Sequence, residues 1–551
     1  MPVFISIVDQ AIYHEGGEKY LFNKGRYLLV YKSPNHPDNR IETVEDYADI
    51  VEYTNIFYND SLFYVDPDKN KLFLFRDWPG NVPIYYYHNK EKKQLFISDS
   101  LPNLASKVDD IKVSLNGIKL FLDDRKHYHS HTIYEGIEML HPGLCIEMDL
   151  TSFSFKIDHW YKPYKKTQIS NHSEAKKAYL SAIDRSILRL IAKDKPVALM
   201  FSGGSDSAFL LTRLLELQYT NIHLFTICVE GSDLQVEYAN EKAKIFNLKI
   251  NPIYINKKEV FKNWLKLFEH CYHYLSDLRI DGIFSSAIPV FNYLKEYFKS
   301  QPVTIVWGSQ YALISPVVGS RGILLYYFFS AIKRIKLLIS QPALAVLGRV
   351  PALNKDHISY ETYSAFKQLY ADALKEFGHP TELMDMVLST NYNSLKHWWM
   401  DWRGKTQQLY YPNAINVYPF HDRMFQEASM PIALNVRIGG AKNIFKMPQE
   451  YKAFFYSLLP SNVPVKSVKR GNYTALPEFL SLFKNEFFYT SLLTILHEPQ
   501  NRKMVDWILH DCKITIPDSY EAFLRLDFQA VEKLSGIVFL ITRTKTDRVS
   551  F

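Results

Sequence analysis

A buried-strand pattern that runs directly into glycine and hydroxyl residues constrains this chain more than any other feature. Residues 196–201 are apolar. The run that follows them is Ser202, Gly203, Gly204, Ser205, Asp206 and Ser207. Glycines let backbone N–H groups approach phosphate oxygens, and the N-terminus of a following helix adds donors and partial positive charge. The pattern predicts a strand, a pyrophosphate-binding loop and a helix over about 206–219.

Elements of alternating type follow this loop. Residues 222–229 and 248–255 have strand patterns, and residues 233–246 between them have a helical pattern. Such alternation predicts a parallel sheet with helices on both faces and ligands at the carboxyl ends of its strands. The loop lacks the Gly-x4-Gly-Lys-Ser/Thr spacing, which disfavours kinases and GTPases. The alternative is an ordinary strand-to-helix turn that is rich in glycine and serine.

Length and composition agree with a large enzyme that handles anions. The chain has 551 residues, enough for two to four domain-sized units. Its 65 basic and 58 acidic residues give a net charge of +7, which fits an anionic substrate such as ATP and favours no nucleic acid partner. The four cysteines have no metal-site spacing, and no secretory signal pattern follows Met1. We therefore expect a cytoplasmic protein.

One apolar stretch bears on membrane association. It covers residues 322–332 and is interrupted by Lys333, Arg334 and Lys336, too soon for a span of about 20 residues. We expect a helix that packs within the domain, so membrane association is disfavoured. A helix that lies on a membrane or covers a peptide groove is the alternative.

Several segments together resemble a known family. Residues 202–207, 303–308 and 417–422 resemble the synthetase domain of class B asparagine synthetases and their relatives. The N-terminal glutaminase-like domain of that family is resembled, in order and spacing, by residues 76–80, 83–86, 96–99, 132–137 and 140–143. The chain is thus similar to the asparagine synthase-related proteins over most of its length.

This resemblance implies the fold and the domain limits. We expect an α+β, Ntn hydrolase-like sandwich domain over residues 1–165 and an α/β synthetase domain with a parallel sheet over residues 175–515. Residues 516–551 would form a C-terminal extension.

The resemblance also implies a site for ATP and Mg²⁺. Asp206 would coordinate Mg²⁺ while the loop amides hold the departing pyrophosphate, and the strand that ends at Val229 would pass under the adenine. Gly308 would line the same site. Lys442 matches a lysine that contacts phosphates, and Lys469 matches the lysine that stabilises the acyl-transfer transition state, with Lys466 as the alternative.

Two departures from the family decide the expected reaction. The glutamine-using members have a nucleophilic cysteine after the initiator methionine, where this sequence has Pro2. Ala312 stands where the family has a second metal-binding aspartate, so Asp206 would act with phosphates and water, or Asp281 would substitute. Loss of ATP chemistry is the third alternative. Relatives that also lack the cysteine include β-lactam synthetase and the lasso-peptide macrolactam synthetases.

The sequence therefore predicts an ATP-dependent, AMP-forming carbon–nitrogen ligase. It would adenylate a carboxylate and let an amine displace AMP, closing a lactam or macrolactam in a small molecule or peptide that bears both groups. The alternatives are a degenerate homologue that binds nucleotide or peptide without turnover, and an ammonia-dependent asparagine synthetase. A second copy of the chain or a precursor peptide is the expected protein partner.

Overall fold

A computed structural model describes part of the chain. The described residues are 4–8, 11–15, 18–21, 27–31, 61–66, 68–76, 83–123, 130–141, 143–160, 169–231, 233–256, 258–260, 262–263, 287–308, 410–429, 431–433, 436, 453–461, 463, 483–512, 514–526 and 528–547.

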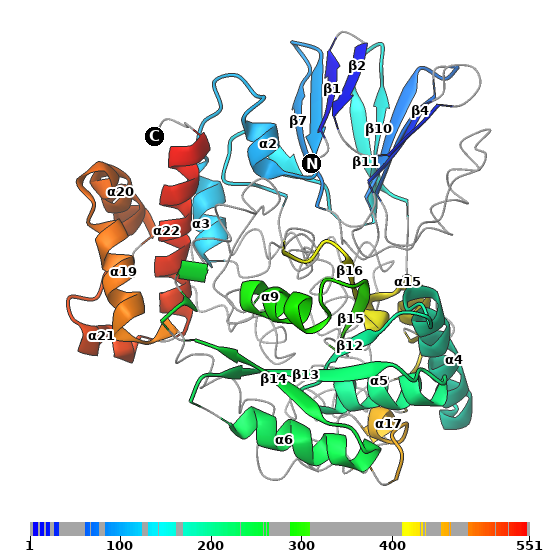
Figure 1. Cartoon of the computed structure of the whole chain (residues 1–551). Helices are drawn as coiled ribbons and strands as arrows, with labels where there is room; N and C mark the ends of the chain where they lie inside the picture. Colours follow the sequence, from blue (N-terminus) through cyan, green and yellow to red (C-terminus); the bar gives the residue numbers. More distant parts are fainter. Residues whose placement is uncertain are drawn as a thin grey trace, which may run out of the picture.

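The N-terminal part is a sandwich of two antiparallel sheets, as the resemblance predicts (Figure 1). In spatial order, the first sheet contains β2 (Ala11–Glu15), β1 (Phe4–Val8), β8 (Gln94–Ser98), β7 (Tyr85–Asn89) and β9 (Ile137–Met139). The second contains β11 (Phe155–His159), β10 (Leu144–Asp149), β6 (Lys71–Phe75), β5 (Ser61–Asp66), β4 (Tyr27–Tyr31) and β3 (Glu18–Leu21).

Alternation along the strands separates the two sides of the first sheet. Ile5 and Ile7 of β1 lie in the core between the two sheets, with side chains from β5, β6 and β10. Phe4 of the same strand belongs instead to the core on the outer side, with α2 (Leu101–Ala105) and α3 (Leu115–Asp123). Successive side chains of a strand point to opposite faces, so β1 serves two cores at once.

The synthetase part is built on a five-stranded parallel sheet. In spatial order its strands are β14 (Ile250–Ile255), β13 (Ile222–Val229), β12 (Val197–Met200), β15 (Val303–Trp307) and β16 (Ala414–Val417). The helices around it are α4 (His172–Leu190), α5 (Ser205–Glu216), α6 (Leu234–Ala243), α9 (Ala287–Tyr297) and α15 (Arg423–Ser429), with α17 (Ala453–Tyr456) nearby. The 3₁₀ turns are η2 (Lys244–Phe246) and η3 (Pro419–His421).

Both faces of this sheet are buried, as the apolar run of β12 predicts. Val197 and Leu199 lie in the core shared with α4 and α5, whereas Ala198 and Met200 lie in the core shared with α9. A parallel strand covered on both faces reads as a continuous apolar run. The prediction of a parallel sheet wound with helices on both faces is thereby confirmed.

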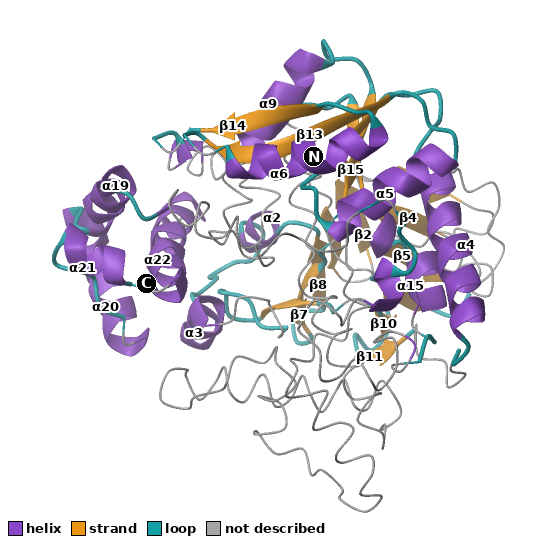
Figure 2. Ribbon diagram, turned by 90° about the horizontal axis from the view of Figure 1, so that it is seen from below, coloured by secondary structure: helices purple, strands orange, loops and turns teal. Residues whose placement is uncertain are grey.

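The C-terminal helices lie beside both parts (Figures 1 and 2). They are α19 (Glu486–Leu496), α20 (Arg502–Cys512), α21 (Tyr520–Arg525) and α22 (Phe528–Asp547), with the turn η6 (Pro499–Asn501) before α20. Their buried side chains form one core with α2 and α3 and with the strand ends at Val229 and Ile255. The helices on either side of the expected boundary at residues 515 and 516 therefore share one core.

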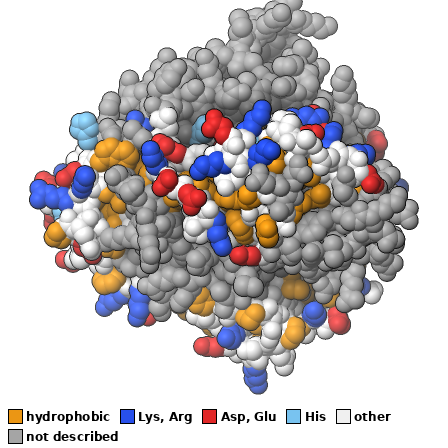
Figure 3. Space-filling model, turned by 90° about the horizontal axis from the view of Figure 1, so that it is seen from above, with side chains coloured by type: hydrophobic (Ala, Val, Ile, Leu, Met, Phe, Trp, Pro, Cys, Tyr) orange, Lys and Arg blue, Asp and Glu red, His pale blue; other side chains and the backbone are white. Residues whose placement is uncertain are grey.

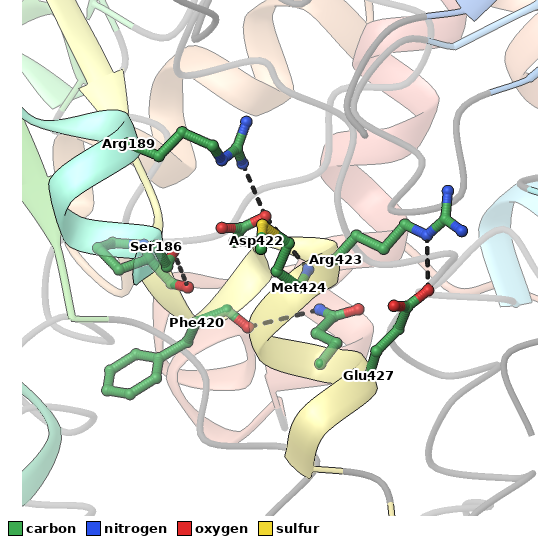
Figure 4. A network of polar contacts seen from close by, with 9 residues as sticks. Ser186, Arg189, Phe420, Asp422, Arg423, Met424 and Glu427 are labelled. Atoms are coloured by element: carbon green, nitrogen blue, oxygen red, sulfur yellow. Dashed lines mark hydrogen bonds and ion pairs between the residues drawn. The ribbon is translucent and has the colours of Figure 1, made fainter. Parts of the chain in front are cut away.

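A buried ion pair holds the segment after β16 against α4 (Figure 4). Arg189 Nη2 donates to Asp422 Oδ1 at 2.7 Å, and the Asp422 side chain is fully buried. One helical turn earlier, Ser186 Oγ donates to the carbonyl of Pro419 at 2.9 Å. Arg423 lies with its guanidinium 5.8 Å from the ring centroid of Trp160, which links this segment to the N-terminal part.

Two further surface features concern partners. Within the described ranges, no helix is both long and apolar enough to cross a membrane. On the face shown in Figure 3, described Lys and Arg side chains are interspersed with Asp and Glu side chains. The apolar stretch over residues 322–332 lies outside the described residues.

Candidate functional site

The order of the parallel strands places a candidate site at the carboxyl end of β12. From β12 the chain goes first to β13 and β14 on one side and then to β15 and β16 on the other. Loops that leave neighbouring strands in opposite directions open a crevice between them, and open α/β sheets bind ligands there. This point of the sheet is where β12 leads into residues 202–207 and β15 leads into Gly308.

The structure brings Gly308 directly against the start of α5. A Cβ atom on Gly308 would lie 3.0 Å from Ser207 Cα and 3.1 Å from Ser207 N. Real Cβ atoms are essentially never closer than this, so a larger residue would push β15 away from α5. The glycine therefore allows the two strand ends and the helix N-terminus to meet.

The loop itself has the backbone that its glycines predict. Gly203 has φ +71°, and a Cβ there would lie 3.0 Å from the ring of Tyr238 and 3.2 Å from Ala239 Cα. Both the positive φ and the close approach require glycine. Gly204 has ordinary dihedral angles, φ −69° and ψ 161°, and is the N-cap residue of α5.

Hydroxyl groups stabilise this loop from within. Ser202 Oγ accepts from Gly204 N at 3.3 Å, and Ser207 Oγ donates to the carbonyl of Gly204 at 3.1 Å. Ser205 Oγ donates to Asp206 Oδ1 at 3.3 Å. The serines thus shape the loop and hold the carboxylate in the first turn of α5.

Asp206 lies in the first helical turn and is not the N-cap residue. The N-cap is Gly204, and α5 has no side-chain capping bond. A helix begun without a side-chain cap offers its first N–H groups and its dipole to an anion. The half-buried carboxylate of Asp206 is close enough to this end to share a cation with a bound phosphate.

Strand β13 extends beyond the end of its pairing with β12, so its last residues lie beside the loop. The β12–β13 ladder ends at the pair Met200 and Phe225, with one more bond from Phe201 N to the Phe225 carbonyl. Beyond it, β13 pairs with β14 as far as Val229. The backbone of residues 226–229 therefore runs past the loop, where the resemblance implies contact with adenine.

Helix α6 packs against the loop, and this contact was not indicated by the sequence. Gln235 Nε2 donates to the carbonyl of Ser202 at 2.7 Å, and Tyr238 and Ala239 lie against Gly203. The buried Lys242 has its Nζ 5.6 Å from the Tyr238 ring centroid, and burial lowers the pKa of Lys242. A lone glutamine early in a helix belongs to no motif, so only the three-dimensional arrangement identifies it.

Asp233 precedes α6 at a position where aspartate commonly caps a helix. It occupies the N-cap position of α6 but makes no side-chain capping bond. Its Oδ1 instead accepts from the Tyr254 hydroxyl at 2.8 Å. The local pattern predicts the right position, but the carboxylate is hydrogen-bonded to Tyr254 of β14, which is distant in sequence.

Several predicted site residues lie outside the described residues. They are Lys442, Lys466, Lys469, Asp281 and Ala312. Their predicted roles stay predictions. Val417, the first residue of the segment 417–422, is fully buried at the end of β16.

The described residues fit a phosphate group and one cation. Gly203 and the uncapped start of α5 surround the loop with backbone donors, which suits phosphate oxygens. Among the described residues no cluster of three or more metal-ligating side chains occurs. Mg²⁺ commonly uses one or two carboxylates plus phosphates and water, so Asp206 alone would suffice with a nucleotide.

Comparisons with known proteins agree with this arrangement. A glutamine amidotransferase domain model matches residues 56–161, and an asparagine synthase model matches residues 178–307. The chain is 25% identical over 209 residues to a probable glutamine-hydrolysing asparagine synthetase of Acanthamoeba polyphaga mimivirus, covering 34% of this chain and 32% of that protein. It is 26% identical over 197 residues to glutamine-hydrolysing asparagine synthetase 2 of Bacillus subtilis, covering 32% and 24%. The matches thus span a third or less of these relatives' lengths.

Likenesses to solved structures are weaker. The glutamine-dependent NAD+ synthetase from Acinetobacter baumannii in complex with ADP is 17% identical, covers 29% of each chain and has a TM-score of 0.19. The NH3-dependent NAD synthetase from Campylobacter jejuni is 12% identical, covers 38% of this chain and 96% of its own, and has a TM-score of 0.21. The two domain models together cover less than half of the chain, and they make it similar to a glutamine amidotransferase domain followed by an asparagine synthase domain.

Proposed function

We propose that this protein is an ATP-dependent synthetase that forms an amide bond by way of an acyl-adenylate. The supporting observation is the meeting of residues 202–207 with Gly308 at the carboxyl ends of β12 and β15. In this proposal the loop amides bind the β- and γ-phosphates, Asp206 binds Mg²⁺, and residues 226–229 lie along the adenine. Pyrophosphate leaves when the substrate carboxylate attacks the α-phosphate, and AMP leaves when an amine attacks the acyl carbon.

For the attacking amine we propose a group already present on the substrate, so that the product is a lactam or macrolactam. Hydrolysis of glutamine by an amidotransferase domain requires a reactive thiolate. Cys145 lies buried in β10 and Cys228 lies buried in β13. Burial raises the pKa of the Cys145 thiol far above its usual range, which disfavours the thiolate. Neither cysteine is suited to release ammonia from glutamine.

The test is ATP–pyrophosphate exchange with the purified protein and Mg²⁺. Aspartate, simple carboxylic acids and peptides with a free amine and an acidic side chain would be screened. Asp206→Ala should abolish the exchange. Asp194→Ala removes an exposed carboxylate just before the amino end of β12 and should leave the exchange unchanged. Exchange that survives Asp206→Ala would contradict the assigned metal role. ATP binding without exchange for any carboxylate would favour the degenerate homologue.

The amine is tested separately. With the adenylated carboxylate identified, product would be measured with no added nitrogen source, with ammonium and with glutamine. Loss of one water from the substrate without added nitrogen supports ring closure. Product formed only with ammonium would instead show an ammonia-dependent synthetase.

A further inference from the structure

Helix α6 fixes the direction of one peptide group in the loop. Gln235 is half-buried in the first turn of α6, and its Nε2 donates to the carbonyl oxygen of Ser202 at 2.7 Å. Ser202 is the first residue of the loop and Gly203 the second. The hydrogen bond therefore acts on the peptide group that joins them.

Peptide geometry turns this contact into a constraint on the site. A trans peptide is planar, so its C=O and N–H groups point in opposite directions. No cis peptide bond occurs among the described residues. When the Ser202 carbonyl points to Gln235, the Gly203 N–H must point away from α6. The structure gives this N–H no acceptor within the described part of the chain.

The neighbouring polar groups are engaged inside the loop. Gly204 N–H donates to Ser202 Oγ, and Ser207 Oγ donates to the Gly204 carbonyl. Since the Gly204 N–H already has a partner, the Gly203 N–H is the one of the two glycine donors that is left for a ligand, beside the first N–H groups of α5. Tyr238 and Ala239 of α6 pack against Gly203, so the 202–203 peptide has little room to rotate.

We propose that Gln235 is a positioning residue for pyrophosphate: it holds the 202–203 peptide so that the Gly203 N–H faces the phosphates. The inference rests on the proposed ATP-binding function of the loop. Without the amide donor, the Ser202 carbonyl loses its partner, and the peptide is free to rotate its N–H out of the site. A peptide flip would present a carbonyl oxygen to phosphate, which repels the anion.

The first test separates phosphate binding from base binding. Calorimetry would measure the affinity of wild type and Gln235→Ala for Mg–ATP, Mg–pyrophosphate and adenosine. Removal of one hydrogen bond that orients the loop should weaken ATP and pyrophosphate by about tenfold. Adenosine affinity should not change, because β13 is untouched. Equal pyrophosphate affinity in the variant and the wild type would overturn the inference, as would an equal loss for adenosine.

The second test uses a variant of the same shape. Gln235→Glu replaces the donor by a carboxylate that repels the Ser202 carbonyl, and only its protonated form can donate. Its pyrophosphate affinity relative to wild type should be lowest at pH 8 and should recover as the pH falls toward 5. If Gln235 acted only through the packing of its side chain, the affinity ratio would not depend on pH. Gln301→Glu is the control, because it adds the same charge at an exposed site near the amino end of β15.

The outcomes distinguish this inference from the function on which it rests. Wild-type protein that binds neither ATP nor pyrophosphate would refute the proposed function. Wild-type binding with a pH-independent Gln235→Glu ratio would refute the positioning role alone. Thermal unfolding of each variant confirms that the folded protein is being compared.

Discussion

Two regions of the parallel sheet are built from opposite kinds of residue. The aromatic cluster lies between β13 and α9 and consists of His223, Phe225, Tyr293, Tyr297 and Phe298. The loop after β12 consists of glycines, serines and one aspartate. In the cluster, the rings of Phe225 and Tyr297 meet edge to face with centroids 5.0 Å apart. In the loop, no side chain is larger than that of Asp206.

This difference separates what holds the sheet together from what it can bind. Large rings fill the space over β13 and contribute stability through buried area and edge-to-face contacts. Small residues leave backbone groups accessible at the carboxyl ends of the strands, and Gly203 adopts a positive φ that larger residues rarely adopt. We therefore expect substitutions in the cluster to change stability and substitutions in the loop to change catalysis.

The largest expected effect is on stability and comes from Phe225→Ala. Phe225 is fully buried, so its removal should lower the free energy of unfolding by about 3–5 kcal/mol. Denaturant titration measures the loss. Phe487→Ala is the control, since Phe487 on α19 is 47% exposed and its removal should cost much less. Exchange activity of the folded Phe225→Ala protein should stay near the wild-type value; a large loss would break the comparison.

The next effect is on catalysis and comes from Gly203→Ala. The new Cβ meets the Tyr238 ring at 3.0 Å and disfavours the positive φ. A displaced loop should lower ATP–pyrophosphate exchange on the order of 10²-fold. Gly231→Ala is the matched control: Gly231 has φ +82°, but a Cβ there meets nothing within 4 Å. If both variants lose exchange equally, backbone strain and not the loop position would be the cause.

How far the sequence predicts this sheet depends on the range of the interactions involved. The strand predicted over residues 222–229 coincides with β13, and the strand predicted after it begins within two residues of β14. These strands are set by local apolar patterns. The helix predicted to end at 219 ends at Glu216, and the one predicted to reach 246 becomes the 3₁₀ turn η2 after Ala243. Ends of elements depend on caps and tertiary contacts, which patterns capture poorly.

In the candidate site too, features set by the local sequence could be predicted, whereas contacts between distant segments could not. Gly203 and Gly308 could be identified from the sequence, because a glycine that follows a strand indicates a positive φ or a close approach of the backbone. The contact between Gly308 and Ser207 joins residues 101 positions apart, and Gln235 contacts Ser202 from a separate helix. The resemblance to a family supplied the first contact in outline. Nothing in the pattern around Gln235 indicates the second, because its role comes only from where α6 packs.

A smaller effect sharpens the comparison within the aromatic cluster. The Tyr297 hydroxyl is 3.0 Å from His223 Nδ1, and Asn221 Oδ1 is 2.8 Å from His223 Nε2. Since Asn221 Oδ1 only accepts, Nε2 carries the proton and Nδ1 accepts from the tyrosine. Tyr297→Phe should therefore cost about 1 kcal/mol of stability, measured by denaturant titration. Tyr293→Phe is the control, and an equal cost there would mean that the hydrogen bond contributes nothing specific.

The smallest effect concerns pH and again falls on stability alone. Burial lowers the pKa of His223, and its two hydrogen-bond partners, Tyr297 and Asn221, are both neutral. Since the unfolded chain binds this proton at a higher pH than the folded chain, acid favours unfolding. The contribution of His223 is complete above about pH 6.5 and is lost as the pH falls through its folded pKa. His223→Gln keeps hydrogen-bonding capacity but cannot titrate, so its melting temperature should fall less than that of wild type between pH 7 and pH 5. Parallel melting curves for the two proteins would contradict this, and any matching change in the pH profile of exchange would tie the cluster to catalysis.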